Sequence, residues 1–205
     1  MNYSNEVLVF RSRQNILDML EYRGFDVSSY QNFCQQELDI LFNENSLNIL
    51  VDHKSQDESC LVNYIHQDKM SQRSLKTILG DKGDGIFNED LGLFSTKNIE
   101  DGFIKDNTKT VILILIGNEV PALQQIVNLY YSYSKKEKRN VYVQIFEIRK
   151  MCFNIMKHHL VPKHEVIRDE SIIQEILENC NCTKKQLPVM IKNDIQARYN
   201  LAVQG

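Results

Sequence analysis

Residues 110–116 read TVILILI, an almost unbroken run of β-branched and leucine side chains. A strand with one covered face alternates apolar and polar residues, whereas a strand covered on both faces is apolar throughout. The run therefore predicts a strand buried between helical layers, and it marks the centre of a first domain.

The residues that follow predict a helix and another strand. Gly117 ends the apolar run, and Pro121 suits a first helical turn because the N–H that proline lacks would have no intrahelical acceptor there. Residues 141–146 then alternate as a strand. Apolar residues at helical spacing between them are Leu123, Ile126, Val127 and Tyr130. Strand, helix and strand in this order predict an α/β layer.

The region before this strand opens with helices. Residues 7–23 are amphipathic, and Gly24 follows where a left-handed helix cap would lie. Ser28 or Ser29 is expected to cap a second helix that carries the apolar residues Phe33, Cys34, Leu38, Leu41 and Phe42. Shorter elements are expected at 47–51 and 61–65, as strands, and at 71–79, as a helix.

A second domain is expected after Lys150. Residues 152–156 are predicted to form its first strand, Asp169 to cap a helix, and Pro188 to end a short segment that starts at Thr183. Asp194 is expected to cap a last turn. The predicted fold is an α/β domain over residues 1–149, with helices around a small mixed sheet, followed by a small second domain over residues 150–205.

Composition restricts the possible functions. The chain has 205 residues and a net charge of −3, whereas proteins that grip nucleic acid alone are usually strongly basic. Five scattered cysteines, an odd number, indicate free thiols in a reducing compartment. The longest apolar run is far below the roughly 20 residues of a membrane helix, so we expect an intracellular protein without membrane contact.

No metal or cofactor site is predicted. His158, His159 and His164 lack a companion Cys or carboxylate at ligand spacing, and Cys180 and Cys182 are separated by one residue where zinc sites use two or more. The Gly-rich segment 80–85 (GDKGDG) lacks the GK[ST] ending of a phosphate loop and the Glu of a calcium loop, so a surface turn is expected.

One catalytic alternative remains open on sequence. Asp52 and Lys54 have the acid-x-Lys spacing with which metal-dependent nucleases hold Mg²⁺ and activate water. The second carboxylate would be Asp39 or Glu37, which fall on the predicted second helix and not on a neighbouring strand. This alternative requires Asp52 and another carboxylate to converge in an open cleft.

Three segments of the C-terminal part occur in a characteristic order: residues 160–164 (LVPKH), residues 186–188 (QLP), and Asp194 followed by residues 197–199 (ARY). In order and spacing they resemble the fifth-subunit family of eukaryotic-type DNA-directed RNA polymerases, whose C-terminal module corresponds to a small separate subunit in the archaeal enzyme. The N-terminal part is similar in layout, with Arg13 in the first helix and residues 23–25 (RGF) after it. Together with the abundance of Asn, Lys and Ile, the resemblance makes a large DNA virus a plausible source.

The resemblance implies a non-catalytic subunit, with nucleotidyl transfer carried by the large subunits. Its N-terminal domain would form part of a jaw beside downstream duplex DNA. Its C-terminal domain, a small α+β fold with a mixed sheet over residues 150–205, would anchor on the largest subunit and support assembly. The nuclease-like fold described for that jaw would explain the Asp52 and Lys54 spacing without activity. The protein would lie in the nucleus if cellular, or in the host cytoplasm and virion if viral. A free-standing interaction adaptor with the same module is the remaining alternative.

The implied contacts can be assigned to residues. The expected subunit-interface residues are His158, Leu160, Pro162, His164, Gln186, Pro188, Arg198 and Tyr199. The expected DNA-proximal residues are Pro121, Lys135, Lys136, Lys138 and Arg139, although a basic loop of this kind also serves solubility alone.

The sequence departs from the family pattern near its end. Asp194 is followed by Ile195 where the family has proline, and residues 201–205 (LAVQG) replace a Gly-Leu-Lys-Arg-Gly stretch. The sequence stops before the hairpin that completes the family's C-terminal sheet, so either a shortened sheet or completion by another chain is expected.

Overall fold

The computed structural model describes residues 4–67, 69–81, 87–88, 90–118, 121–191 and 194–201. The chain divides into an N-terminal unit, Met1–Phe153, and a C-terminal unit, Asn154–Gly205. Most of the predicted glycine-rich turn at 80–85 lies outside the described residues. No helix formed by the described residues combines the length and the apolar character needed to cross a membrane.

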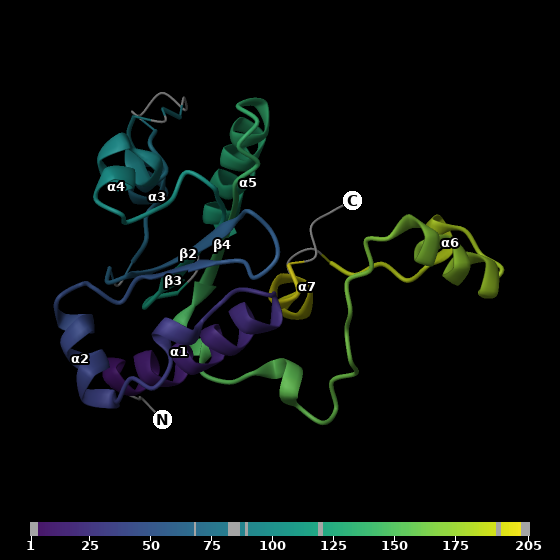
Figure 1. The fold of residues 1–205 in the computed structure, drawn as a ribbon, viewed down its shortest axis with the longest axis horizontal. Helices are drawn as coiled ribbons and strands as arrows, with labels where there is room; N and C mark the ends of the chain where they lie inside the picture. Colours follow the sequence, from purple (N-terminus) through teal and green to yellow (C-terminus); the bar gives the residue numbers. More distant parts are fainter. Residues whose placement is uncertain are drawn as a thin grey trace. The chain divides into compact units, whose positions relative to one another are not determined.

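The N-terminal unit is built on a four-stranded mixed sheet (Figure 1). β1 (Ile49–Asp52) pairs antiparallel with β2 (Ser59–Ile65), whereas β3 (Thr108–Leu115) and β4 (Tyr142–Glu147) continue the sheet in parallel. β3 lies between β2 and β4, and all its side chains except that of Lys109 are buried. The predicted α/β fold class and central strand are confirmed.

Helices cover both faces of this sheet, which explains why β3 is apolar throughout. Val111, Leu113 and Leu115 pack in one core with the buried face of α5 (Pro121–Lys136) and with α3 (Gln72–Ile78). On the other face, the Tyr64 hydroxyl of β2 lies 3.4 Å from the Ser12 hydroxyl of α1 (Asn5–Tyr22). The remaining helical segments of the unit are η1 (Ser28–Tyr30), α2 (Gln35–Asn43), η2 (Gly92–Phe94), α4 (Thr96–Glu100) and η3 (Ile148–Met151).

The second helix begins later than the serines predict. Ser28 and Ser29 form the short η1 instead, and Asn32 then takes a left-handed conformation, with φ of 67°, that no helix continues through. Cys34 becomes the N-cap of α2, and its backbone N–H donates to the Glu37 carboxylate over 2.8 Å. Cysteine is an uncommon cap, so this start was not readable from local sequence.

The C-terminal unit contains only helical segments among its described residues. They are η4 (Ile155–Lys157), α6 (Glu170–Asn179), η5 (Lys184–Gln186) and α7 (Ile195–Tyr199). The predicted caps Asp169 and Asp194 are confirmed, since their carboxylates accept from the N–H groups of Ser171 and Gln196. The strand predicted at 152–156 is wrong, because Asn154 accepts from the Met156 N–H and turns the backbone into η4. The mixed sheet predicted for this domain is likewise absent from residues 154–191 and 194–201.

Two buried acidic groups of β2 predict loss of stability at high pH. Burial raises the pKa of the Cys60 thiol from 9.0 to about 12 and that of the Tyr64 hydroxyl from 10.0 to about 12. The unfolded chain loses these protons at lower pH than the folded chain does. The contribution of these two groups to the free energy of unfolding is therefore at its full value below about pH 9 and falls between pH 9 and pH 12. We expect a loss of about 2 kcal/mol from Cys60 between pH 8 and pH 10.5.

Urea unfolding at the two pH values measures this loss. Cys60→Val should flatten the pH dependence while keeping a folded protein, since valine is apolar and of similar size. An unchanged slope in the Cys60→Val protein would show that the thiol does not cause the effect.

Candidate interaction surface

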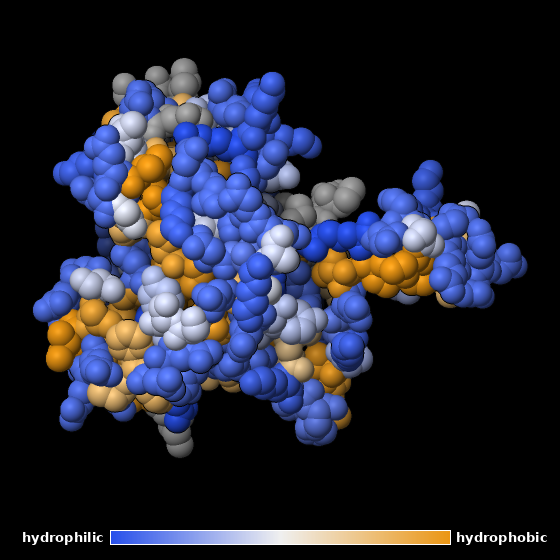
Figure 2. Space-filling model, viewed as in Figure 1, coloured by the Kyte–Doolittle hydropathy of each residue, from blue (hydrophilic) through white to orange (hydrophobic). Residues whose placement is uncertain are grey.

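The C-terminal unit exposes apolar side chains that a free surface rarely carries together. Leu160 is 76% exposed, Val189 90% and Ile191 74%, while Ala197 and Tyr199 are the apolar residues buried among those described. Figure 2 shows hydrophobic surface along the part of the chain that carries α6. Contiguous exposed apolar surface of this kind marks a site for another protein.

The most exposed part is an extended segment, Leu187–Ile191. The side chain of Gln186 accepts from the Thr183 N–H over 2.7 Å and closes η5, and Pro188 prevents the helix from continuing. Asp194 then starts α7. Within the described part of the chain, the backbone N–H groups of Val189 and Met190 have no acceptor, so this segment presents open hydrogen-bonding groups between apolar side chains.

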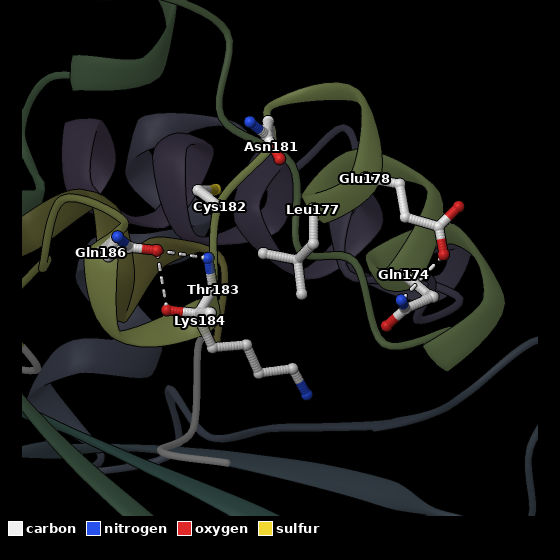
Figure 3. A pocket seen from close by; sticks show the side chains of 8 residues that line it. All are labelled: Gln174, Leu177, Glu178, Asn181, Cys182, Thr183, Lys184 and Gln186. Atoms are coloured by element: carbon white, nitrogen blue, oxygen red, sulfur yellow. Dashed lines mark hydrogen bonds between the residues drawn. The ribbon is translucent and has the colours of Figure 1, made fainter.

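An open groove of about 550 Å³ lies between α6 and η5 (Figure 3). Leu177 projects from α6 toward the η5 segment and forms an apolar floor. The rim is polar: Gln174 donates to Glu178 over 2.8 Å, and Gln186 is held by the Thr183 hydroxyl over 2.9 Å. An apolar floor with a polar rim is the usual composition of a protein interface.

The two predicted interface histidines make local contacts. His158 stacks on His159 with ring centroids 4.6 Å apart, and its Nδ1 accepts from the Leu160 N–H over 3.3 Å. His164 Nδ1 lies 2.7 Å from the Pro162 carbonyl and must be the donor, because a carbonyl only accepts. These bonds fix the loop between η4 and α6, which presents Leu160 and Pro162 outward.

The other predicted interface residues separate into exposed and structural positions. Gln186 and Pro188 are exposed, although the Gln186 side-chain oxygen already accepts the Thr183 N–H that caps η5. Tyr199 is 5% exposed and its hydroxyl accepts from Asn154 over 3.1 Å, so it holds the unit together and offers little surface. Arg198 is half-buried beside it on α7. Residues 189–191 were missed, although three apolar residues between two capped turns gave the signal.

The predicted DNA-proximal residues lie at the two ends of α5 and just after it. Pro121 begins α5, whereas Lys135 and Lys136 end it about 22 Å away along the helix axis. Arg139 is occupied within the unit, because its guanidinium lies 5.5 Å from the Phe94 ring centre and 3.6 Å from the Asp106 carboxylate. The basic cluster is therefore reduced to three exposed lysines, Lys135, Lys136 and Lys138. The first two also stabilise the C-terminal end of the helix dipole.

The nuclease alternative is not supported. The Asp52 carboxylate accepts from the Lys105 ammonium over 2.6 and 2.7 Å, and Glu37 is held in the cap of α2, where the Cys34 N–H lowers its pKa. Over the described ranges, no three His, Cys, Asp or Glu side chains gather in an arrangement that would hold a metal ion. Lys54 is exposed, and its backbone N–H donates to the Gly24 carbonyl.

Known proteins similar to this chain belong to one class, the subunits of DNA-directed RNA polymerases. The family model described as RNA polymerase Rpb5, C-terminal domain, matches residues 153–205. The chain is 23% identical over 190 residues to DNA-directed RNA polymerase V subunit 5A of Arabidopsis thaliana, covering 93% of this chain and 75% of that protein. Subunit 5B of polymerases IV and V of the same plant is 24% identical over 195 residues, covering 93% of this chain and 76% of the relative.

The archaeal subunit Rpo5 of Methanopyrus kandleri is 50% identical over 40 residues, or 20% of this chain and 44% of the relative. Residues 153–205 thus match the C-terminal domain of RNA polymerase fifth subunits, and the chain as a whole is similar to fifth subunits of these enzymes. The predicted resemblance is confirmed, and the viral source stays a prediction.

Proposed function

We propose that this chain is a non-catalytic subunit of a multisubunit DNA-directed RNA polymerase and that its C-terminal unit docks on the largest subunit. The observation that carries the proposal is the coincidence of two features. The segment matched by the family model, residues 153–205, also carries the exposed apolar residues Leu160, Val189 and Ile191. Apolar surface left in water costs free energy that a partner recovers by covering it.

Docking by strand addition is the mode that best suits the extended segment. Residues 187, 189 and 191 point to one side of an extended backbone and residues 188 and 190 to the other. A partner strand would pair with the edge that carries the Val189 N–H, since Pro188 has no N–H on the opposite edge, and the partner's surface would cover the first set of side chains. The groove beside α6 would accept a second contact from the same partner.

The N-terminal unit would lie beside downstream duplex DNA. The support is the exposed group Lys135, Lys136 and Lys138, whose ammonium groups suit phosphate contacts. With a net charge of −3, the chain would make these contacts only while other subunits hold the DNA in place. Nucleotidyl transfer would remain with the large subunits. The complex would work in the nucleus of a cellular source, or in host cytoplasm and virion of a viral one.

Affinity purification from the source organism tests the proposal. A tagged chain should recover the two largest polymerase subunits in near-equal amounts. In the same complex, photocrosslinking from Lys136 should reach downstream DNA, whereas crosslinking from Lys97 on α4 serves as the control. Recovery of other proteins without either large subunit would favour a free-standing adaptor and overturn the polymerase assignment. Recovery without a DNA crosslink would overturn the DNA contact alone.

A further inference from the structure

A cavity of about 170 Å³ opens in the N-terminal unit, where α1, η1 and the start of α2 meet. Arg13 and Gln14 come from α1, Tyr30 ends η1, and Asn32 and Phe33 come from the segment that joins η1 to α2. The cavity belongs to a different unit from the docking surface, and neither the polymerase role nor the strand-addition mode makes use of it.

Among the residues that the structure describes, Arg13 is a buried cation without an anion beside it. It is 3% exposed, its Nη1 donates to the Leu47 carbonyl over 3.1 Å, and its Nε is buried without an acceptor. The described residues supply it with no carboxylate partner. Buried charges of this kind are almost always paired, because leaving water without a counter-charge is costly.

The neighbouring aromatic rings compensate this charge only in part. The guanidinium carbon lies 5.3 Å from the Phe33 ring centre and 5.8 Å from that of Tyr30. A ring face attracts the cation, but it gives the Nε–H no lone pair. Burial lowers the pKa of Arg13, and the groups that act in the opposite direction are the tyrosines Tyr64 and Tyr30, not a carboxylate.

The rim of the cavity adds two further donors. Gln14 and Asn32 are exposed, and their side-chain amides have no hydrogen-bond partner in the described part of the chain. The Tyr30 wall is fixed, since its hydroxyl donates to the Leu50 carbonyl over 3.2 Å and accepts from the Leu50 N–H over 3.1 Å. A fixed aromatic wall with a cation and two amides is a preformed site.

We propose that this cavity binds a carboxylate group carried on a short apolar stem. The carboxylate would lie toward Arg13 and accept from the amides of Gln14 and Asn32, and the stem would pack on Tyr30 and Phe33. The volume suits one such group, and aromatic walls suit an apolar stem better than a hydrated phosphate. An acidic side chain of another protein and a small aryl or alkyl carboxylate share this chemistry.

Titration of the full ¹⁵N-labelled chain, followed by NMR, tests the site. Sodium benzoate should shift the Arg13 Nε–H and the backbone signals of Asn32 and Phe33 in a saturable way, with a dissociation constant on the order of 1 mM, as expected for so small a ligand. Benzamide, which has the same shape without the charge, should bind at least tenfold more weakly. A second titration uses an acetylated, amidated Leu-Glu-Phe peptide, with the Leu-Gln-Phe peptide as its uncharged counterpart.

Variants separate binding from folding. The double variant Gln14→Ala/Asn32→Gly should stay folded, because alanine favours the exposed helix position and glycine favours a φ of 67°. It should bind benzoate at least fivefold more weakly, whereas Gln31→Ala, at an exposed neighbour outside the cavity, should bind normally. Arg13→Met should abolish binding.

Each outcome decides the proposal. Preference for the Glu peptide over benzoate supports the site and assigns it to a protein partner, while binding of benzoate alone supports it and assigns it to a small molecule. No saturable shift up to about 20 mM, a range well above the expected fragment affinity, overturns it. Equal binding of benzamide, or unchanged binding by the double variant, also overturns it.

Discussion

Replacing Gly80 by alanine is expected to unfold most of the protein, whereas replacing Gly102 should be tolerated. Both glycines have left-handed backbones, with φ of 89° and 71°. A Cβ at position 80 would lie 2.5 Å from the Leu91 carbonyl oxygen and 2.6 Å from that of Asn88, and these backbone atoms cannot give way as a flexible side chain does. A Cβ at Gly102 would meet nothing within 4 Å.

The comparison separates steric overlap from backbone strain. Gly102→Ala measures the left-handed penalty alone, about 1 to 2 kcal/mol. Gly80→Ala adds the overlap, and we expect a total above about 4 kcal/mol, close to the whole stability of a small domain. Chemical denaturation and the loss of near-ultraviolet circular dichroism measure both. If the two variants differ by less than about 1 kcal/mol, the close approach of Gly80 to the 88–91 segment is not a constraint in solution.

The parts of the fold that sequence predicted are those set by neighbouring residues. The run at 110–116 predicted β3 because burial on both faces removes polar side chains from a strand, whatever its partners are. Asp169 and Asp194 predicted the starts of α6 and α7 because a cap bonds its own next turn. The buried face of α5 followed from helical spacing alone.

The parts that could not be predicted depend on contacts between distant residues. Asp52 resembles a catalytic acid in local sequence, but Lys105, 53 residues further along, neutralises it. Arg139 was predicted to lie near DNA from a run of basic residues, and its contacts with Phe94 and Asp106, which come from another segment, could not be read from that run. The Arg13 cavity is formed by α1 and the segment before α2, whose conformation depends on the left-handed Asn32.

The candidate docking surface was predicted only in part for the same reason. The short sequence motifs predicted Leu160 and Pro188 as interface residues, and both are exposed. They also predicted Tyr199, which is buried. Exposure of Val189 and Ile191 follows from the lack of strand pairing in the described C-terminal residues, whereas the family resemblance implied a sheet in this domain. The apolar segment thus has the sequence of a strand without a neighbour on this chain's described residues.

The double substitution Val189→Asp/Ile191→Asp should therefore remove the chain from its complex without unfolding it. Both side chains lie on one side of the extended segment and are 90% and 74% exposed, so charges there cost the free protein little. In a complex, two carboxylates would be buried against an apolar partner without counter-charges. Substitution at one central interface position costs about 2 kcal/mol or more, about a thirtyfold loss of affinity, so the two substitutions together should lower recovery of the large subunits by more than about thirtyfold.

Leu129→Asp is the matched control for this experiment. Leu129 is an apolar residue of α5 that is 60% exposed, so it receives the same change at similar exposure outside the C-terminal unit. Quantitative affinity purification of the three proteins, with circular dichroism to confirm that each is folded, measures the effect. Because strand addition also uses the Val189 N–H, Val189→Pro should lower recovery as well. Normal recovery of the double variant, or an equal loss with Leu129→Asp, would place the contact with the large subunits somewhere other than residues 187–191.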